Sequence, residues 1–246
     1  MRVRVPLKLS AQAIRAKESH FPMFLLTALL PIVVFPLARL DGVLLQRMAL
    51  PLSVTLLVLE SLRAMPAWVA QLGPIHINGI YRSLGLFSVV AVWIPLLQGQ
   101  KLPFTLQIIL LGLRAVFYLL TAIRIVQVLA NCERVSGKTL SLGAAGYVHL
   151  GLTAGLLATV LQMADPDSFN LGAVPVQESL AARLSYFSFV TLGSLGYGDV
   201  VPASPIGESF AVLLSLSSTL YLSLLIGLLL SRFISAREDE IQESTQ

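Results

Sequence analysis

Charged residues are scarce in this 246-residue chain, at 12% of the total, whereas hydrophobic residues make up 56%. Soluble domains carry about a quarter charged residues, so the composition excludes an ordinary soluble protein and is typical of an integral membrane protein. Cys132 is the only cysteine, which excludes a disulfide within the chain, and there are only three histidines. These few reactive groups and the scattered acids form no catalytic or metal-binding spacing. We therefore expect neither enzyme activity nor a cofactor.

Long apolar runs fill much of the sequence. A membrane-spanning helix needs about 20 mostly apolar residues. Six windows qualify, and the third is the shortest: about 21–40, 43–62, 83–98, 103–130, 144–163 and 206–234. The fold class predicted is an all-α membrane protein with six transmembrane helices in the lipid bilayer.

Basic residues give the chain a net charge of +4. If the N-terminus is inside, most of them lie on the cytoplasmic side, in agreement with the positive-inside rule. Membrane orientation therefore explains the charge better than nucleic acid does, and both termini are expected in the cytoplasm of a multi-pass cell-membrane protein. Residues 1–20 mix basic and apolar residues, which predicts a cytoplasmic amphipathic arm on anionic lipid. A signal peptide is the alternative, but the apolar run that follows is too long for one.

A glycine-containing stretch lies between the last two apolar windows. Residues 188–202 read Ser-Phe-Val-Thr-Leu-Gly-Ser-Leu-Gly-Tyr-Gly-Asp-Val-Val-Pro, and a helix from Glu178 to Leu192 is expected to lead into them. Gly196 and Gly198 accept backbone dihedrals that other residues avoid. Non-helical backbone at membrane depth is tolerated only where it lines a cavity or is buried in protein. The pattern favours a re-entrant pore loop between the fifth and sixth spans, and an ordinary glycine-rich turn is the alternative.

The central six residues, Ser-Leu-Gly-Tyr-Gly-Asp at 194–199, resemble the potassium-channel selectivity filter, usually Thr-Val-Gly-Tyr-Gly-Asp. Residues 136–234 resemble the two-helix pore module of bacterial potassium channels that carry four additional N-terminal transmembrane segments. The resemblance implies that backbone carbonyls replace the hydration shell of K⁺, which is the permeant ion and not a cofactor. It also implies a homotetramer, because each chain supplies one loop. The residues implied are the ion sites Ser194, Leu195, Gly196 and Tyr197 with the Ser194 hydroxyl, Gly198 within the filter, and Thr191 and Asp199 as support.

Four positions depart from the family pattern. Gly193 and Ser194 stand where threonines are usual, and Ser194 keeps the hydroxyl but lacks the methyl group. Leu195 replaces a valine behind the carbonyls. Ser218 stands where the inner-helix hinge glycine is expected, which makes Ser218 and Gly227 the two candidate gate or hinge positions. These departures bear on the rigidity of the filter and the position of the gate more than on the preference for potassium.

The first four spans lack the arginine repeat of a voltage sensor. Arg114 and Arg124 stand ten residues apart, which places them ~80° apart around a helix, so they form no stripe. We expect no strong voltage gating. Glu60 is the acid placed within these spans, and we predict an intramembrane ion pair with Arg114 or Arg124. The alternative is that these charged side chains extend to the inner interface instead.

The chain divides into four parts on this interpretation. Residues 1–20 form the arm, 21–135 a sensor-like four-helix domain, 136–235 the pore domain and 236–246 a cytoplasmic tail too short for a regulatory domain in the same chain. Within the pore domain, Gly151-x-x-x-Gly155 predicts a close helix–helix contact. The favoured function is a tetrameric potassium-selective channel that conducts K⁺ passively. The alternatives are a weakly selective cation channel and a non-conducting membrane subunit with the pore fold.

Overall fold

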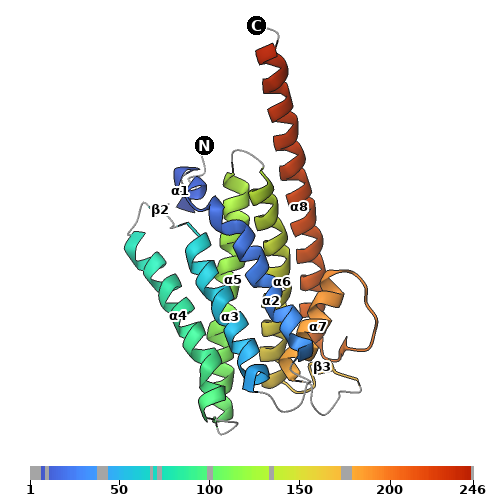
Figure 1. Ribbon diagram of the computed structural model, residues 1–246. Helices are drawn as coiled ribbons and strands as arrows, with labels where there is room; N and C mark the ends of the chain where they lie inside the picture. The colour runs from blue at the N-terminus through green and yellow to red at the C-terminus, as the bar shows by residue number, and fades with distance from the viewer. Residues whose placement is uncertain are drawn as a thin grey trace.

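The computed structural model describes residues 7–8, 11–37, 44–66, 69–70, 74–98, 102–132, 136–172 and 179–244. Residues 1–6 and 9–10 of the predicted arm, and 245–246 of the predicted tail, lie outside these ranges. The described chain is almost entirely helical, with several apolar helices, as expected for an all-α membrane protein (Figure 1). Its elements in order are β1 (Leu7–Lys8), α1 (Ala11–Arg15), the 3-10 turn η1 (Glu18–His20), α2 (Phe21–Leu37), α3 (Leu44–Ala64), β2 (Val69–Ala70), α4 (Pro74–Gln98), α5 (Phe104–Asn131), α6 (Gly137–Ala164), β3 (Phe169–Asn170), α7 (Leu180–Leu192), β4 (Val201–Pro202) and α8 (Pro205–Ser244).

Four helical stretches among the described residues are long and apolar enough to cross a membrane. These are Gln12–Val34, Phe104–Asn131, Gly137–Ala164 and Pro205–Leu228. α3 and α4 lie alongside them in the same bundle, and α4 contains a shorter apolar stretch, Asn78–Ile94 (Figure 1). The structure therefore agrees with a multi-pass membrane protein, and the count of six crossings stays a prediction.

Three helices are clearly longer than their predicted apolar windows: α4, α6, which begins at Gly137 and not near residue 144, and α8. α4 begins at Pro74 and not near residue 83, because proline is well suited to the first turn of a helix. α8 extends for 40 residues through the predicted tail, where no glycine or proline interrupts residues 228–244. At 1.5 Å per residue α8 is about 60 Å long, and Figure 1 shows its end projecting beyond the bundle.

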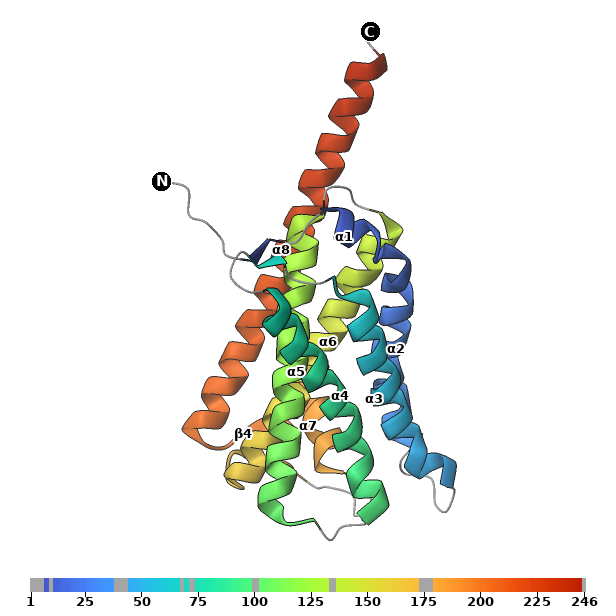
Figure 2. The ribbon, with the colours of Figure 1, turned by 90° about the vertical axis from the view of Figure 1, so that its left-hand side faces the viewer.

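α6 is the central helix of the bundle. It packs against α2, α5 and α7, whereas α8 contacts mainly α6 and α7 and lies at one side, as Figure 2 shows. The largest core cluster joins α2, α3, α4, α5 and α6, with Phe21, Phe24, Leu57, Phe117 and Leu142 fully buried. Most apolar side chains described on α8 are exposed in the single chain.

Glycines on α6 allow α7 to approach closely. A Cβ atom added at Gly151 would lie 2.2 Å from Cε1 of Phe189, and one added at Gly155 would lie 2.4 Å from Oγ of Ser185. Neither distance leaves room for a side chain, so the close helix contact predicted from this pair is confirmed. The partner helix is α7.

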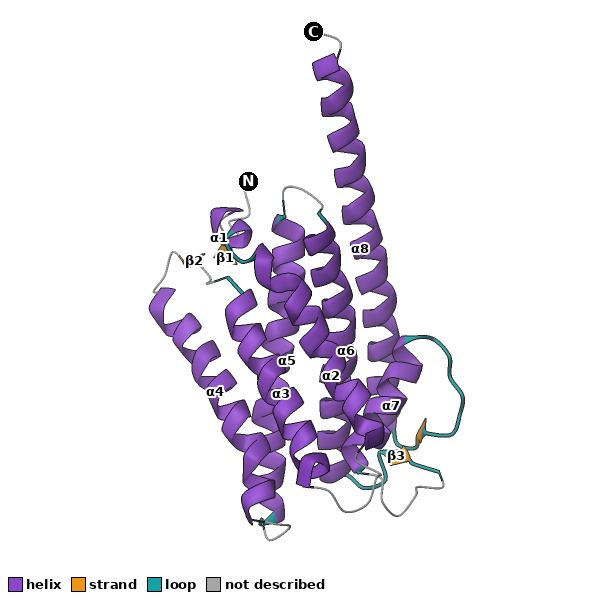
Figure 3. Ribbon diagram, in the orientation of Figure 1, coloured by secondary structure: helices purple, strands orange, loops and turns teal. Residues whose placement is uncertain are grey.

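The segment around α7 begins and ends at one end of the bundle. β3 pairs antiparallel with β4, with Phe169 opposite Pro202 and Asn170 opposite Val201. The end of α6 and the start of α8 are thereby held together, and Figure 3 shows α7 at this end of the bundle with its loop extending out to the right. α1 and the C-terminal end of α8 lie at the opposite end of the bundle (Figure 1).

Candidate functional site: a pore loop

α7 is a short apolar helix with defined ends. Ser179 caps its N-terminus, since the Ser179 side chain accepts a hydrogen bond from the Ala182 amide at 3.2 Å. At the C-terminus the amides of Gly193, Ser194 and Leu195 donate to carbonyls of the last turn at 2.9–3.0 Å. The last carbonyls of a helix lack intrahelical partners, so the first residues of the loop satisfy them here. The acceptors are Phe189, Thr191 and Val190, so Thr191, predicted as filter support, contributes its backbone carbonyl.

The loop that follows has an unusual backbone. Ser194, Gly196 and Gly198 have φ values of 57°, 57° and 77°, while Leu195 and Tyr197 between them keep negative φ. An extended strand points successive carbonyls to opposite sides, but this alternation turns successive peptide units toward one side. Among the described residues Ser194 is the only non-glycine with positive φ. A left-handed conformation costs a residue with a side chain roughly 1–2 kcal/mol, so Ser194 is held there by its surroundings.

The loop is uncovered in the single chain. Every residue from Gly193 to Asp199 is exposed, and the side chains of Leu195 and Tyr197 reach 59% and 66% exposure. A non-helical backbone at membrane depth would need protein or a water-filled cavity beside it, because lipid offers its polar groups no hydrogen bonds. The ion sites predicted at residues 194–197 stay a prediction.

Arg183 anchors the end of the loop that leads to β4. Its Nε and NH2 groups donate to the Leu171 carbonyl at 3.2 and 3.1 Å, and NH2 also lies 3.4 Å from the Asp199 carboxylate. NH2 further donates to the Asp199 carbonyl at 3.3 Å. Gly172, at φ 63°, passes so close that an added Cβ would lie 2.5 Å from the Asp199 carbonyl oxygen. Asp199, predicted to brace the filter against the pore helix, is therefore linked to α7 through Arg183. Sequence reasoning missed Arg183, although it is the only charged residue in α7.

Replacing Arg183 with glutamine is expected to loosen this end of the loop. The variant loses the forked contacts to Leu171 and Asp199, which lysine could not reproduce either. If residues 194–198 form the predicted filter, the K⁺/Na⁺ permeability ratio of purified, reconstituted protein should fall roughly threefold to tenfold, the range for losing one or two modest hydrogen bonds. Arg82→Gln is the matched control, because Arg82 is exposed and lies on another helix, α4. An unchanged ratio in Arg183→Gln would remove Arg183 from the filter support.

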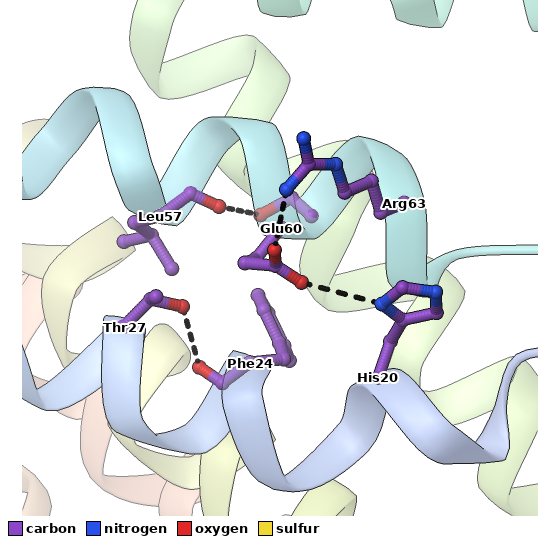
Figure 4. Close-up of polar contacts among 7 residues, drawn as sticks. His20, Phe24, Thr27, Leu57, Glu60 and Arg63 are labelled. Carbon is purple, nitrogen blue, oxygen red and sulfur yellow. Dashed lines mark hydrogen bonds and ion pairs between the residues drawn. The ribbon is translucent and has the colours of Figure 1, made fainter.

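Glu60 has different partners from those predicted. Figure 4 shows its carboxylate between Arg63, at 2.9 Å, and His20, at 3.6 Å. The predicted ion pair of Glu60 with Arg114 or Arg124 is therefore wrong. Arg63 lies one turn further along α3 and reaches Glu60 directly, whereas both predicted partners are on another helix, α5.

The two arginines of α5 have different surroundings. Arg124 is buried, stacks over the Tyr81 ring at 4.1 Å from its centroid and donates to the Pro66 carbonyl. Arg114 lies with Tyr118 beside a small cavity, and its buried Nε has no hydrogen-bond partner in the described structure. The two arginines thus contact different neighbours.

The two hinge candidates on α8 differ in their surroundings. Ser218 is 3% exposed, and its hydroxyl donates to the Leu192 carbonyl at 2.6 Å. An added Cβ at Gly227 would meet no atom within 4 Å. Leu192 is the last residue of α7, so Ser218 contacts the inner end of the pore loop.

Comparison with known proteins points to the same segment. Residues 176–235 match a protein family described as "Ion channel", and the match includes α7, the loop and most of α8. It spans less than half of the chain. No curated protein and no solved structure matches the chain. The family match and the apolar helical fold together support a pore-loop ion channel in a membrane.

Proposed function

We propose that this protein is a potassium-selective channel that conducts K⁺ passively through a backbone-carbonyl filter at residues 194–198. The observation that carries the proposal is the alternating positive φ at Ser194, Gly196 and Gly198, within the segment that matches the ion-channel family. This alternation turns successive carbonyls toward one side, as a dehydrated K⁺ requires. Four loops are needed to surround the ion, so the proposal includes a homotetramer.

Two exposed surfaces of the single chain support assembly. The loop is uncovered from Gly193 to Asp199, and α8 exposes a long apolar surface that includes Val212, Leu216 and Leu220. Apolar surface of this extent is typical of an interaction site. In the proposed tetramer α6 and α8 line the pore, α7 points its negative C-terminal end at the pore axis, and α2 to α5 lie outside.

The proposed orientation follows from the ends of the bundle. α1 and the end of α8 lie together, opposite the β3–β4 end (Figure 1). We propose that the first of these ends is cytoplasmic, in a cell membrane, which directs the outer end of the filter away from the cytoplasm and obeys the positive-inside rule. Strong voltage gating is not proposed, because Arg114 and Arg124 form no stripe.

A weakly selective cation channel is the second candidate. Ser194 keeps the hydroxyl of the innermost predicted ion site but lacks the methyl group of threonine, which leaves its side chain less constrained. A less constrained inner site discriminates less well between K⁺ and Na⁺.

Reconstituted protein under bi-ionic conditions tests both candidates. We expect K⁺ flux into proteoliposomes and a reversal potential set by K⁺. Equal permeability to Na⁺ and K⁺ would favour the weakly selective channel. The absence of any cation flux would contradict a channel and favour a non-conducting subunit.

A further inference from the structure

The Leu192 carbonyl is held by two helices other than its own. It is the last carbonyl of α7, and Leu192 is 2% exposed. A buried carbonyl without a partner is costly, and the loop amides bond to other carbonyls of the last turn. The Leu192 carbonyl instead accepts from Ser218 of α8 at 2.6 Å and from the Tyr147 hydroxyl of α6 at 3.0 Å. The two hydroxyl oxygens lie 3.5 Å apart, so α6, α7 and α8 meet at this point.

Ser218 behaves differently from its neighbours on α8. Serine and threonine within helices commonly donate to the carbonyl four residues back. Ser217 does so to Leu213 at 2.7 Å, and Thr219 does so to Ser215 at 3.1 Å. The Ser218 hydroxyl is directed across to another helix. A glycine at this position, as the resemblance led us to expect, could not make the contact.

We propose that Ser218 and Tyr147 are positioning residues for the inner end of the filter. Leu192 directly precedes Gly193 and Ser194, where the proposed ion sites begin. The two hydroxyls fix the Leu192 carbonyl, and through it the strained backbone of Ser194, to α6 and α8. A displacement of α8 at Ser218 therefore breaks these bonds and changes the innermost ion site. This inference rests on the proposed function for its effect on ions, but its structural part can be measured without conduction.

A second contact on the same side of α8 strengthens this anchor. The Tyr221 hydroxyl donates to the Gly143 carbonyl of α6 at 2.7 Å, and an added Cβ at Gly146 would lie 2.1 Å from that hydroxyl. Beyond Tyr221 most described side chains of α8 are exposed, and Gly227 has open space around it. Ser218 therefore belongs to the fixed part of α8, and Gly227 stays the hinge candidate.

Backbone amide exchange in the full-length purified protein tests the structural part. We expect Ser218→Ala to raise exchange in the peptide covering residues 189–196 roughly threefold to tenfold, as the loss of one hydrogen bond implies. Ser218→Thr keeps the hydroxyl and should restore protection. Tyr147→Phe should give a smaller increase, because Ser218 still donates to Leu192. Ser217→Ala is the matched control, and its exchange in this peptide should equal that of the unaltered protein.

The K⁺/Na⁺ permeability ratio of the same variants tests the effect on ions. We expect a fall of roughly threefold to tenfold in Ser218→Ala and recovery in Ser218→Thr. Unchanged amide exchange in Ser218→Ala, or an equal increase in Ser217→Ala, would overturn the inference.

Increased amide exchange with an unchanged K⁺/Na⁺ permeability ratio in a conducting protein would also overturn it, since the anchor would then not affect the ion site. If the unaltered protein carries no ions, the proposed function fails, and the exchange data still decide whether Ser218 holds the loop. Should Ser218→Ala not fold, Tyr147→Phe provides the same comparison.

Discussion

Replacing Gly196 with alanine is expected to lower K⁺ flux at least about a hundredfold. Gly196 has φ 57°, and an added Cβ would meet no atom within 4 Å in the single chain. The expected loss of flux is therefore caused by the backbone conformation that residue 196 must adopt, and not by a steric clash within the chain. Alanine in a left-handed conformation costs roughly 1–2 kcal/mol, and four proposed subunits around one pore raise the total to about 4–8 kcal/mol. This conformational cost exceeds the roughly 2.7 kcal/mol that corresponds to a hundredfold change in rate. Flux into proteoliposomes is the measurement.

Gly112→Ala is the matched control for Gly196→Ala. Gly112 lies within α5, where an added Cβ also meets no atom within 4 Å, and its φ is not positive. Alanine is favoured over glycine in a helix by roughly 0.5–1 kcal/mol, so flux should be unchanged and stability slightly higher. Equal flux from both variants would show that the positive φ at Gly196 is not needed for conduction, and the proposed filter would be wrong.

The helical content and the position of α7 could be predicted from the sequence, because apolar run length and breakers determine both. The predicted pore helix, Glu178–Leu192, differs from α7 by two residues, since Ser179 is the cap. The bounds of α4 and α8 could not be predicted from hydropathy. A proline such as Pro74 can either begin or end a helix, so it does not fix the start of α4. The C-terminal part of α8 is polar, so hydropathy does not show that the helix continues there.

The contacts around the site were harder to predict than its motif. The glycines that permit positive φ can be read from the sequence of the loop. Ser194 also has positive φ, and no local sequence pattern predicts that conformation for a serine. Side-chain partners depend on which helices are neighbours. For that reason the sequence does not reveal the partners of Glu60, nor the contacts of Arg183 and Tyr147. The departure of Ser218 from the family pattern was visible, but its bond to Leu192 depends on how α7 and α8 pack.

Replacing Gly155 with alanine is expected to destabilise the protein by about 1–3 kcal/mol per subunit, the usual cost of an overpacked core. The new Cβ would lie 2.4 Å from Oγ and 2.8 Å from Cα of Ser185. A side-chain oxygen can rotate away, but the Cα atom is part of the α7 backbone. α7 must therefore move away from α6, and this changes the position of the loop that follows. The midpoint of thermal unfolding in detergent, with the assembled fraction from size-exclusion chromatography, is the measurement.

The rank order of three glycine-to-alanine variants tests this packing argument more sharply than one variant does. At Gly151 the three atoms nearest an added Cβ all belong to the Phe189 ring, which can turn aside in part, so Gly151→Ala should destabilise less than Gly155→Ala. Gly112→Ala has open space and should not destabilise at all. The expected order of unfolding midpoints is Gly112→Ala highest, Gly151→Ala intermediate and Gly155→Ala lowest. If Gly155→Ala unfolded at the same temperature as Gly112→Ala, α7 could not lie against α6 as described, because no rotation of the Ser185 side chain removes the backbone contact.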